Sequence, residues 1–288
     1  MRKKIALYAG GLLLVLLLPH LILAKEIKSK KYVFDVTSEK LLVARLDIDI
    51  SSDFRIRPNP DSKQIIVEIN YNPEKMDVDA DFDANSNHLY VSVDVEKWSK
   101  GFHGDQNSGE CTVYFPLGIP IELNSSCKAG EINFDLGGLS LENVDLRLAA
   151  GTVKVRFQKP NPIQMDDFSI DGKIGELELE KLGNAGFQTA DISAGIGVLS
   201  LGLSGSKKID FPQDISVDMK IGEINLILPE NRPIKLRISK FLFLSQSDIP
   251  DEFERHGSYY THGDIKNARN LLYLRISPGL GALNIDWD

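Results

Sequence analysis

A glycine that opens an alternating apolar segment recurs through the second half of this 288-residue chain. In the clearest copy, Gly222 is followed by Glu-Ile-Asn-Leu-Ile-Leu. Successive glycines are separated by 21, 24, 22 and 25 residues, and then by 59. Repeats of this length cannot bury their apolar side alone, and they stack into solenoids with a shared core. The glycines of the repeat are Gly130, Gly151, Gly175, Gly197, Gly222 and Gly281.

The alternation also runs upstream of each glycine, with a shift of phase across it. Before Gly222, the apolar residues at alternate positions are Ile215, Val217, Met219 and Ile221. We therefore predict that the residue before each glycine and the residue two after it both face the core. On each side of the glycine every second residue faces inward, as in a β-strand, but the alternation is displaced by one residue across the glycine. This indicates two strands that meet at a corner, where a residue without a Cβ is favoured.

These patterns predict an all-β fold, a parallel β-solenoid built from coils of about 20–25 residues with glycine corners. Residues between the inward positions, such as Asp145, Lys154 and Glu178, are polar and mixed in sign, as on a solvated face. A β-sandwich, which also uses short alternating strands, is the alternative. We divide the chain into a leader at 1–24, an N-terminal β region at 25–125 that continues into the solenoid, and the repeats at 126–288 with a rim insertion at about 229–271.

The leader at residues 1–24 is a basic and then apolar segment, expected to be helical. Basic residues at positions 2–4 precede an apolar stretch, and Ala24 is a small residue of the kind found at a signal-peptide cleavage site. Ile22, three residues before that cut, departs from the small-residue pattern, so an uncleaved membrane anchor is the alternative. The basic flank keeps the N-terminal end cytoplasmic, and either interpretation predicts an exported chain, periplasmic, at the cell surface or membrane-anchored.

Charge and cysteine content exclude several classes of protein. Without the three basic residues of the leader, 30 Lys and Arg remain against 41 Asp and Glu, a formal charge of −11. We therefore expect no nucleic-acid partner. Two cysteines are too few for a disulfide scaffold, a zinc ribbon or an iron–sulfur cluster. Cys111 and Cys127 occupy inward positions and pack as small hydrophobic residues, unless they form a disulfide in an oxidising compartment.

The segments after the repeats point to a known group of proteins. The chain contains Phe253-Glu-Arg-His-Gly-Ser-Tyr-Tyr260 and closes with an apolar segment at Leu272–Trp287. Together with the glycine corners, these segments resemble the bacterial putative-adhesin or toast-rack β-solenoid superfamily, similar to the extracytoplasmic or C-terminal domains of cell-wall-active antibiotic response proteins. The resemblance implies a bacterial cell-envelope protein, adhesive or modulatory, and it brings no active site to these positions.

Two groups of residues have the composition of metal sites. Four aspartates alternate as in a calcium loop, but Phe82 stands where the turn glycine belongs and His88 where the bidentate Glu belongs. His256 and His262 lie near Glu252 and Glu254, with no helix to fix their spacing. In both cases we favour a solvated surface. The four aspartates are Asp77, Asp79, Asp81 and Asp83. We thus expect no catalytic, metal-binding or cofactor-binding residue and no cofactor.

Three functions are compatible with this sequence. We favour a non-enzymatic, exported cell-envelope protein that presents an extended β-solenoid surface for adhesion or binding, with an envelope protein or a surface polymer as its partner. The first alternative is a modulator of a membrane-bound envelope-stress sensor, which makes a membrane protein the partner. The second is a carbohydrate-active β-helix enzyme. That chemistry needs carboxylates that converge on one face, and the mixed polar residues between the inward positions do not predict such a cluster.

Overall fold

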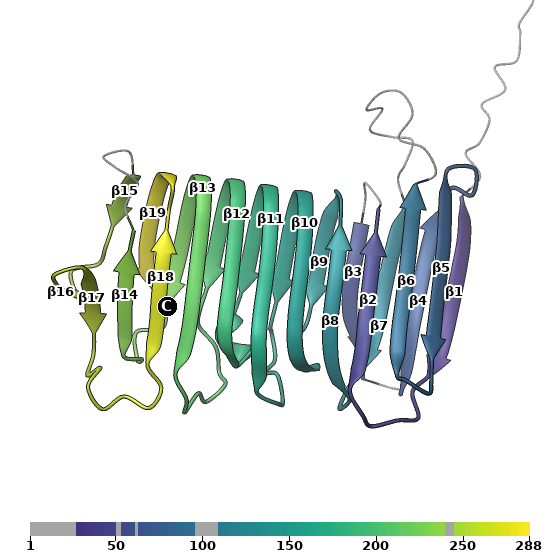
Figure 1. The fold of residues 1–288 in the computed structure, drawn as a ribbon, viewed down its shortest axis with the longest axis horizontal. Coiled ribbons are helices and arrows are strands. Elements are labelled where there is room, and N and C mark those ends of the chain that lie inside the picture. Colours follow the sequence, from purple (N-terminus) through teal and green to yellow (C-terminus); the bar gives the residue numbers. More distant parts are fainter. Residues whose placement is uncertain (1–26, 50–52, 61–62, 96–108, 240–244) are drawn as a thin grey trace, which may run out of the picture.

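The computed structural model describes residues 27–49, 53–60, 63–95, 109–239 and 245–288. Over these ranges the chain forms a flattened, largely parallel β-solenoid whose coils stack along the long axis (Figure 1). Each central coil is one long strand that crosses one face, turns at a glycine and crosses the other face. These coils are β10 (Ser140–Arg156), β11 (Met165–Glu180), β12 (Phe187–Gly202) and β13 (Gln213–Leu228). The predicted all-β solenoid is confirmed, and the leader helix lies outside the described residues.

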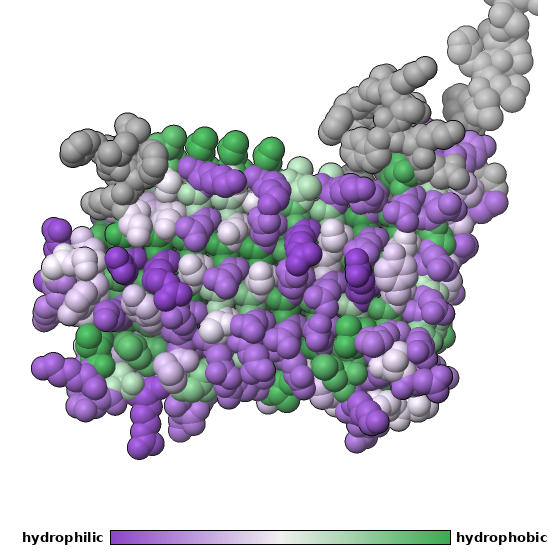
Figure 2. Space-filling model, in the orientation of Figure 1, coloured by the Kyte–Doolittle hydropathy of each residue, from purple (hydrophilic) through white to green (hydrophobic). Residues whose placement is uncertain are grey.

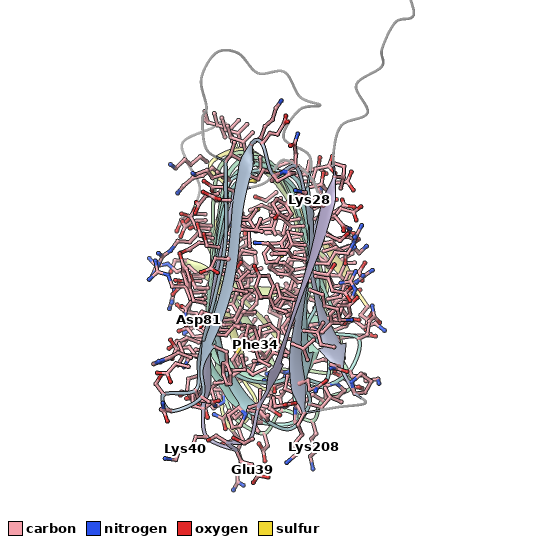
Figure 3. The ribbon with its side chains drawn as sticks, turned by 90° about the vertical axis from the view of Figure 1, so that its right-hand side faces the viewer. Lys28, Phe34, Glu39, Lys40, Asp81 and Lys208 are labelled. Atoms are coloured by element: carbon pink, nitrogen blue, oxygen red, sulfur yellow. The ribbon has the colours of Figure 1, made fainter. Side chains whose placement is uncertain are left out.

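The solenoid has two sheet faces, which enclose a continuous apolar core. Figure 3 looks along the long axis and shows the side chains packed between the two faces, with Phe34 among them. The front face contains the first parts of β10 to β13 together with β5 (Met76–Asp83), β6 (His88–Val95), β2 (Leu42–Ile48), β8 (Pro120–Cys127), β18 (Leu272–Ser277), β14 (Ile234–Ile238), β17 (Tyr259–His262) and β16 (Glu254–His256).

The rear face contains the second parts of the same long strands. Its other members are β1 (Lys28–Asp35), β4 (Gln64–Tyr71), β7 (Glu110–Pro116), β3 (Asp53–Asn59), β9 (Glu131–Asp135), β19 (Leu280–Trp287) and β15 (Ser245–Asp248). On both faces, inward residues alternate with exposed or half-buried ones, as in β4, because a strand buries every second side chain when one face is covered.

The order of coils in space differs from their order in the sequence at both ends. The β2–β3 coil lies between the β6–β7 and β8–β9 coils. Likewise, the last coil, β18–β19, lies between β13 and the β14–β15 coil. The segment at 229–271 therefore supplies the outermost coil and an antiparallel hairpin of β16 and β17. Antiparallel strands β1 and β5 lie at the opposite end.

Buried asparagines close the lower edge, where the chain passes from the rear face to the front face. The Asn161 side chain donates to the carbonyl of Leu141 at 2.9 Å and accepts from its N–H at 3.1 Å. The Asn184 side chain donates to the carbonyl of Phe157 at 2.9 Å. Asn184 ends the short 3-10 helix at Leu182–Asn184, which is the one helical segment in the described ranges. These amides satisfy backbone groups that the loops would otherwise bury unpaired.

Glycines form a continuous stack along the upper edge, where the chain turns from the front face to the rear face. Gly151, Gly175, Gly197, Gly222 and Gly281 lie in register, and their φ angles run from +123° to +157°. A Cβ at any of them would overlap the carbonyl oxygen of the neighbouring glycine in the stack. Glycine is required here for two reasons, the backbone conformation and the close approach of the next coil.

One expectation about this corner is wrong. None of the residues before these glycines is buried: Ala129 and Ala150 are half-buried, and Ile174, Ile196, Ile221 and Leu280 are exposed. In β13, the last inward residue before the corner is Met219, and the next is Ile224, two after the glycine. The backbone changes direction over the residues between them, so the strand alternation ends before the glycine is reached.

We predict that Gly175→Ala lowers the free energy of unfolding by roughly 2–5 kcal/mol, since the new Cβ meets both a positive φ and the carbonyl of Gly151. The matched control is Glu176→Ala, because this neighbouring side chain is exposed, and the change should stay within about 0.5 kcal/mol. Denaturant melts of the two variants measure the difference. Equal stability would contradict a tightly packed glycine stack.

Candidate functional site

A row of exposed aliphatic side chains lies along the upper edge of the solenoid, and we call it the corner ridge. Its members are Ile174, Ile196, Ile221 and Leu280, with 59%, 50%, 44% and 36% of their surface exposed. Each directly precedes a glycine of the stack. Figure 2 shows hydrophobic side chains in a row on this edge, above the more hydrophilic front face.

The parallel register brings these four side chains together. Ile174 pairs with Ile196, Ile196 with Ile221, and Ile221 with Leu280. Neighbouring strands lie about 4.8 Å apart, so the ridge extends over roughly 14 Å. Exposed aliphatic residues are ordinary when they are scattered, whereas a contiguous strip on a soluble surface marks a place of interaction. The register thus turns one exposed residue per coil into a continuous surface.

Charged side chains of opposite sign flank the corner ridge. Lys173 and Lys220 are exposed on its front side, two residues before a glycine. Glu176 and Glu223 lie on its rear side, one residue after a glycine. Asn284 donates to Glu223 Oε1 at 2.9 Å, which holds that half-buried carboxylate against the neighbouring coil. The ridge is therefore an apolar strip with two lysines on its front side, of which Lys173 pairs with Asp171, and two glutamates on its rear side.

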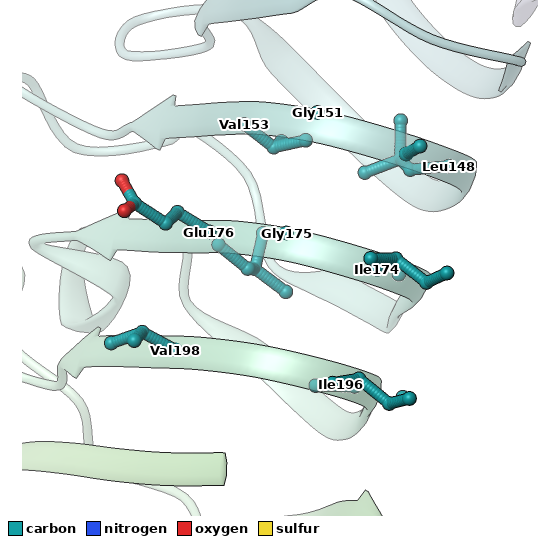
Figure 4. A pocket seen from close by; sticks show the side chains of 13 residues that line it. Leu148, Gly151, Val153, Ile174, Gly175, Glu176, Ile196 and Val198 are labelled. Carbon is teal, nitrogen blue, oxygen red and sulfur yellow. The ribbon is translucent and has the colours of Figure 1, made fainter. Parts of the chain in front are cut away.

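A small hollow lies beside the ridge, over β10, β11 and β12. It is lined by Leu148, Ile174 and Ile196 among others, and Gly172 contributes no side chain to it (Figure 4). Its volume is about 20 Å³, which is enough for roughly one water molecule. This edge therefore offers a surface to a partner and has no space for a small-molecule ligand in this hollow.

The lower edge has a wider hollow that is lined by cations. Arg232 donates to Gln213 Oε1 at 2.6 Å and to the carbonyl of Asn270 at 2.8 Å, and burial lowers the pKa of its guanidinium to about 10. Lys207 Nζ donates to the carbonyls of Asn161 and Ile163. Both cations thus bind backbone or amide oxygens of the loops, a structural role that the sequence analysis did not identify. No sequence signal marks such residues, because their partners are main-chain atoms.

The four alternating aspartates lie on one exposed face of β5. Asp77, Asp79, Asp81 and Asp83 point outward, and Met76, Val78 and Ala80 between them are buried. Asp83 accepts hydrogen bonds from the Ser86 hydroxyl and the Asn85 N–H, which lower the pKa of its carboxyl. The favoured interpretation, a solvated strand surface, agrees with this arrangement. A strand cannot wrap its carboxylates around one calcium ion as a loop does.

The two histidines lie on the C-terminal hairpin and have different partners. His256 Nε2 lies 3.5 Å from Glu254 Oε2, and its ring stacks on Tyr259. His262 Nε2 lies 2.9 Å from the carbonyl oxygen of Glu230, and its ring centroid is 4.5 Å from that of Trp287. Among the described residues, no group of three or more His, Cys, Asp or Glu side chains is placed to hold a metal ion.

Both cysteines lie in the core as free thiols. Cys111 on β7 is fully buried, and Cys127 at the end of β8 is 2% exposed. Burial raises the pKa of both thiols, to about 12 for Cys127. The thiolate is the reactive form of cysteine, so these groups are inert in the folded protein. The inward placement predicted from the strand alternation is confirmed.

We predict that dithionitrobenzoate detects no thiol in the native protein at about pH 8, because the raised pKa keeps both groups protonated. Both thiols should react once the protein is unfolded in guanidinium. A denatured protein without free thiols would show that the two cysteines are bridged, the alternative left open by the sequence.

Comparisons with known proteins agree with this architecture. A model of the N-terminal domain of toast_rack, DUF2154, matches residues 24–180, which is more than half of the chain. The chain belongs to the toast-rack family. No curated protein matches it. In the part of the chain that the structure describes, no helix is long and apolar enough to span a bilayer.

The solved structures that match this toast-rack chain have low sequence identity to it. A putative cell adhesion protein from Clostridium sporogenes ATCC 15579 is 14% identical, with a TM-score of 0.48, covering 91% of this chain and 100% of its own. A putative adhesin from Bacteroides fragilis NCTC 9343 is 11% identical, with a TM-score of 0.39 and coverage of 91% and 98%. A putative lipid binding protein from Parabacteroides distasonis ATCC 8503 is 11% identical, with a TM-score of 0.31 and coverage of 89% and 96%.

Proposed function

We propose that this toast-rack protein is a non-enzymatic binding protein of the bacterial cell envelope, exported from the cytoplasm, whose solenoid surface holds a partner. The observation that carries the proposal is the in-register stacking of the outward side chains. Each outward position of one coil lies beside the same position of the next, so each face carries straight rows of polar groups. One such row on the rear face consists of Lys154, Glu178, Ser200, Asn225 and Asn284.

Rows of this kind suit a partner that is itself extended. A surface polymer or a long edge of another protein can meet a polar side chain at every coil, and many weak contacts then add up. Two carboxylates of the rear face are engaged in the fold: Lys154 Nζ lies 2.9 Å from Glu178 Oε2 and also contacts Glu180. At this position the pair of carboxylates is held by a lysine and is not free for the acid and base roles of a glycosidase, which favours binding over hydrolysis here.

The modulator of a membrane-bound stress sensor is a second candidate, and the corner ridge favours it. An apolar strip on an exported protein fits a partner at or in the membrane better than it fits a hydrated polymer. The two candidates differ in the chemistry of what is bound, and one experiment separates them.

We predict that the tagged full chain, used as bait with solubilised membranes and separately with purified surface polymer, retains one of the two at a fixed ratio. Retained polymer supports the adhesin, and a stoichiometric integral membrane protein supports the modulator. Heat-unfolded bait is the control for non-specific retention. Cleavage of the polymer during the assay would overturn the non-enzymatic proposal.

We also predict that a reporter that is active only in the cytoplasm, fused after Asp288, is silent, because the leader directs the chain outward. N-terminal sequencing of the mature protein then decides between cleavage after Ala24 and retention of the leader. Strong reporter activity would contradict export.

A further inference from the structure

The first described strand begins at the edge that carries the corner ridge. Thr152 directly follows a corner glycine, and its paired residues can be traced from strand to strand across the rear face as far as β1. Ser29 of β1 lies at the same level as the glycine stack, and Figure 3 shows Lys28 at the upper edge, opposite Lys40 and Lys208. The residues at this level are Thr152, Glu131, Asp53, Glu110, Asn70 and Ser29.

The chain that precedes β1 is short and follows an apolar leader. Residues 25–27 alone separate the leader from Lys28, and an extended chain covers at most about 3.6 Å per residue. If the leader stays in the membrane, β1 therefore begins within roughly 15 Å of the bilayer surface. Ile27, immediately before β1, is 50% exposed and adds an apolar side chain at this point.

The start of β1 and the ridge are well separated along the same edge. In the rear face, β1 is followed by β4, β7, β3, β9, β10 and then β11, which carries Ile174. At about 4.8 Å per strand, the ridge begins roughly 30 Å from the start of β1 and ends roughly 45 Å from it, at Leu280. Two apolar attachments this far apart on one edge fix the direction of the long axis relative to a membrane.

We propose that the corner ridge is a lipid-contacting edge, and that the retained leader and the ridge together hold the solenoid lengthwise on the outer face of the membrane. The proposal deepens the proposed envelope function and rests on it. Apolar side chains on an interfacial element enter the boundary between headgroups and acyl chains. The flanks of the ridge fit a zwitterionic surface, because the exposed Lys220 can reach phosphates while the exposed Glu176 can face the cationic part of the headgroups.

A second copy of this chain is the competing occupant. It could place its own ridge against this one, but four aliphatic side chains over roughly 14 Å form much less than the surface of about 800 Å² per partner that a stable complex buries. The lipid surface requires no such area, since the leader supplies the second attachment.

The test is the depth of a fluorophore on the ridge of the full-length protein. Ile196→Cys is labelled with an environment-sensitive nitrobenzoxadiazole dye in phosphatidylcholine nanodiscs that hold one chain each. The buried wild-type thiols take up no dye under native conditions, so the label is specific. The control is Lys208→Cys, which places the same dye on the exposed opposite edge.

We expect nitroxide-labelled lipid to quench the dye at position 196 at least about threefold more than at position 208, with a depth of roughly 5–10 Å into the interface. Aqueous iodide should show the reverse order. In a background of Ile174→Glu and Ile221→Glu, both exposed positions, the lipid quenching at 196 should fall to the level at 208. This double variant leaves the core unchanged. It distinguishes contact of the ridge with lipid from a protein that is only held near the membrane by the leader.

Four outcomes would overturn the proposal. Equal iodide quenching at both positions would show that the ridge stays in water. Protection of the dye at position 196 from iodide that appears only when a disc holds two chains would assign the ridge to a second copy. Removal of the leader in cells, seen by N-terminal sequencing, would remove the anchor and overturn this proposal, while leaving the proposed binding function intact. A cytoplasmic location would overturn both this proposal and the proposed function.

Discussion

The contact of backbone with backbone at the glycine corners is the constraint on which the rest of the structure depends. Nothing larger than a hydrogen atom fits between Gly222 and the carbonyl of Gly197, and the same holds for each pair along the stack. A slip of one residue would drive a side chain into that carbonyl and would also reverse the two faces of the strand. The stack therefore sets the register of the coils that contribute a glycine to it. The buried rows, the polar rows and the corner ridge all follow from that single alignment.

The sequence predicted the coils well because the glycine spacing reports one turn of the solenoid directly. It did not predict which coils are neighbours at the ends, since the segments at 234–248 and 272–287 both have the apolar pattern that could pair with β13. The structure supplies a physical reason for the order observed. Gly281 continues the stack against Gly222, whereas the other coil has Ser245 at the corresponding position. A residue with a Cβ suits the outer end of the stack better than its interior.

The candidate site was present in the sequence but was misread as core. Alternation alone assigns an apolar residue such as Ile221 to the interior, since nothing in a period of two shows where a strand turns. The recurrence of isoleucine or leucine directly before a glycine of the repeat is a sequence signal that could identify such a ridge. The inward positions of Cys111 and Cys127 and the outward positions of the β5 aspartates were predicted correctly, because these residues lie within strands, where the alternation still holds.

The position of β18 and β19 between β13 and the β14–β15 coil has a consequence for how the chain is made. The outermost coil is synthesised before the coil that lies beneath it, so the strand edge of β13 stays open until the last residues emerge. Folding cannot proceed coil by coil behind the ribosome or the export channel in the manner of a simple solenoid. The segment at 272–287 is inserted between β13 and the β14–β15 coil, so this end of the solenoid is completed only when that segment has been delivered.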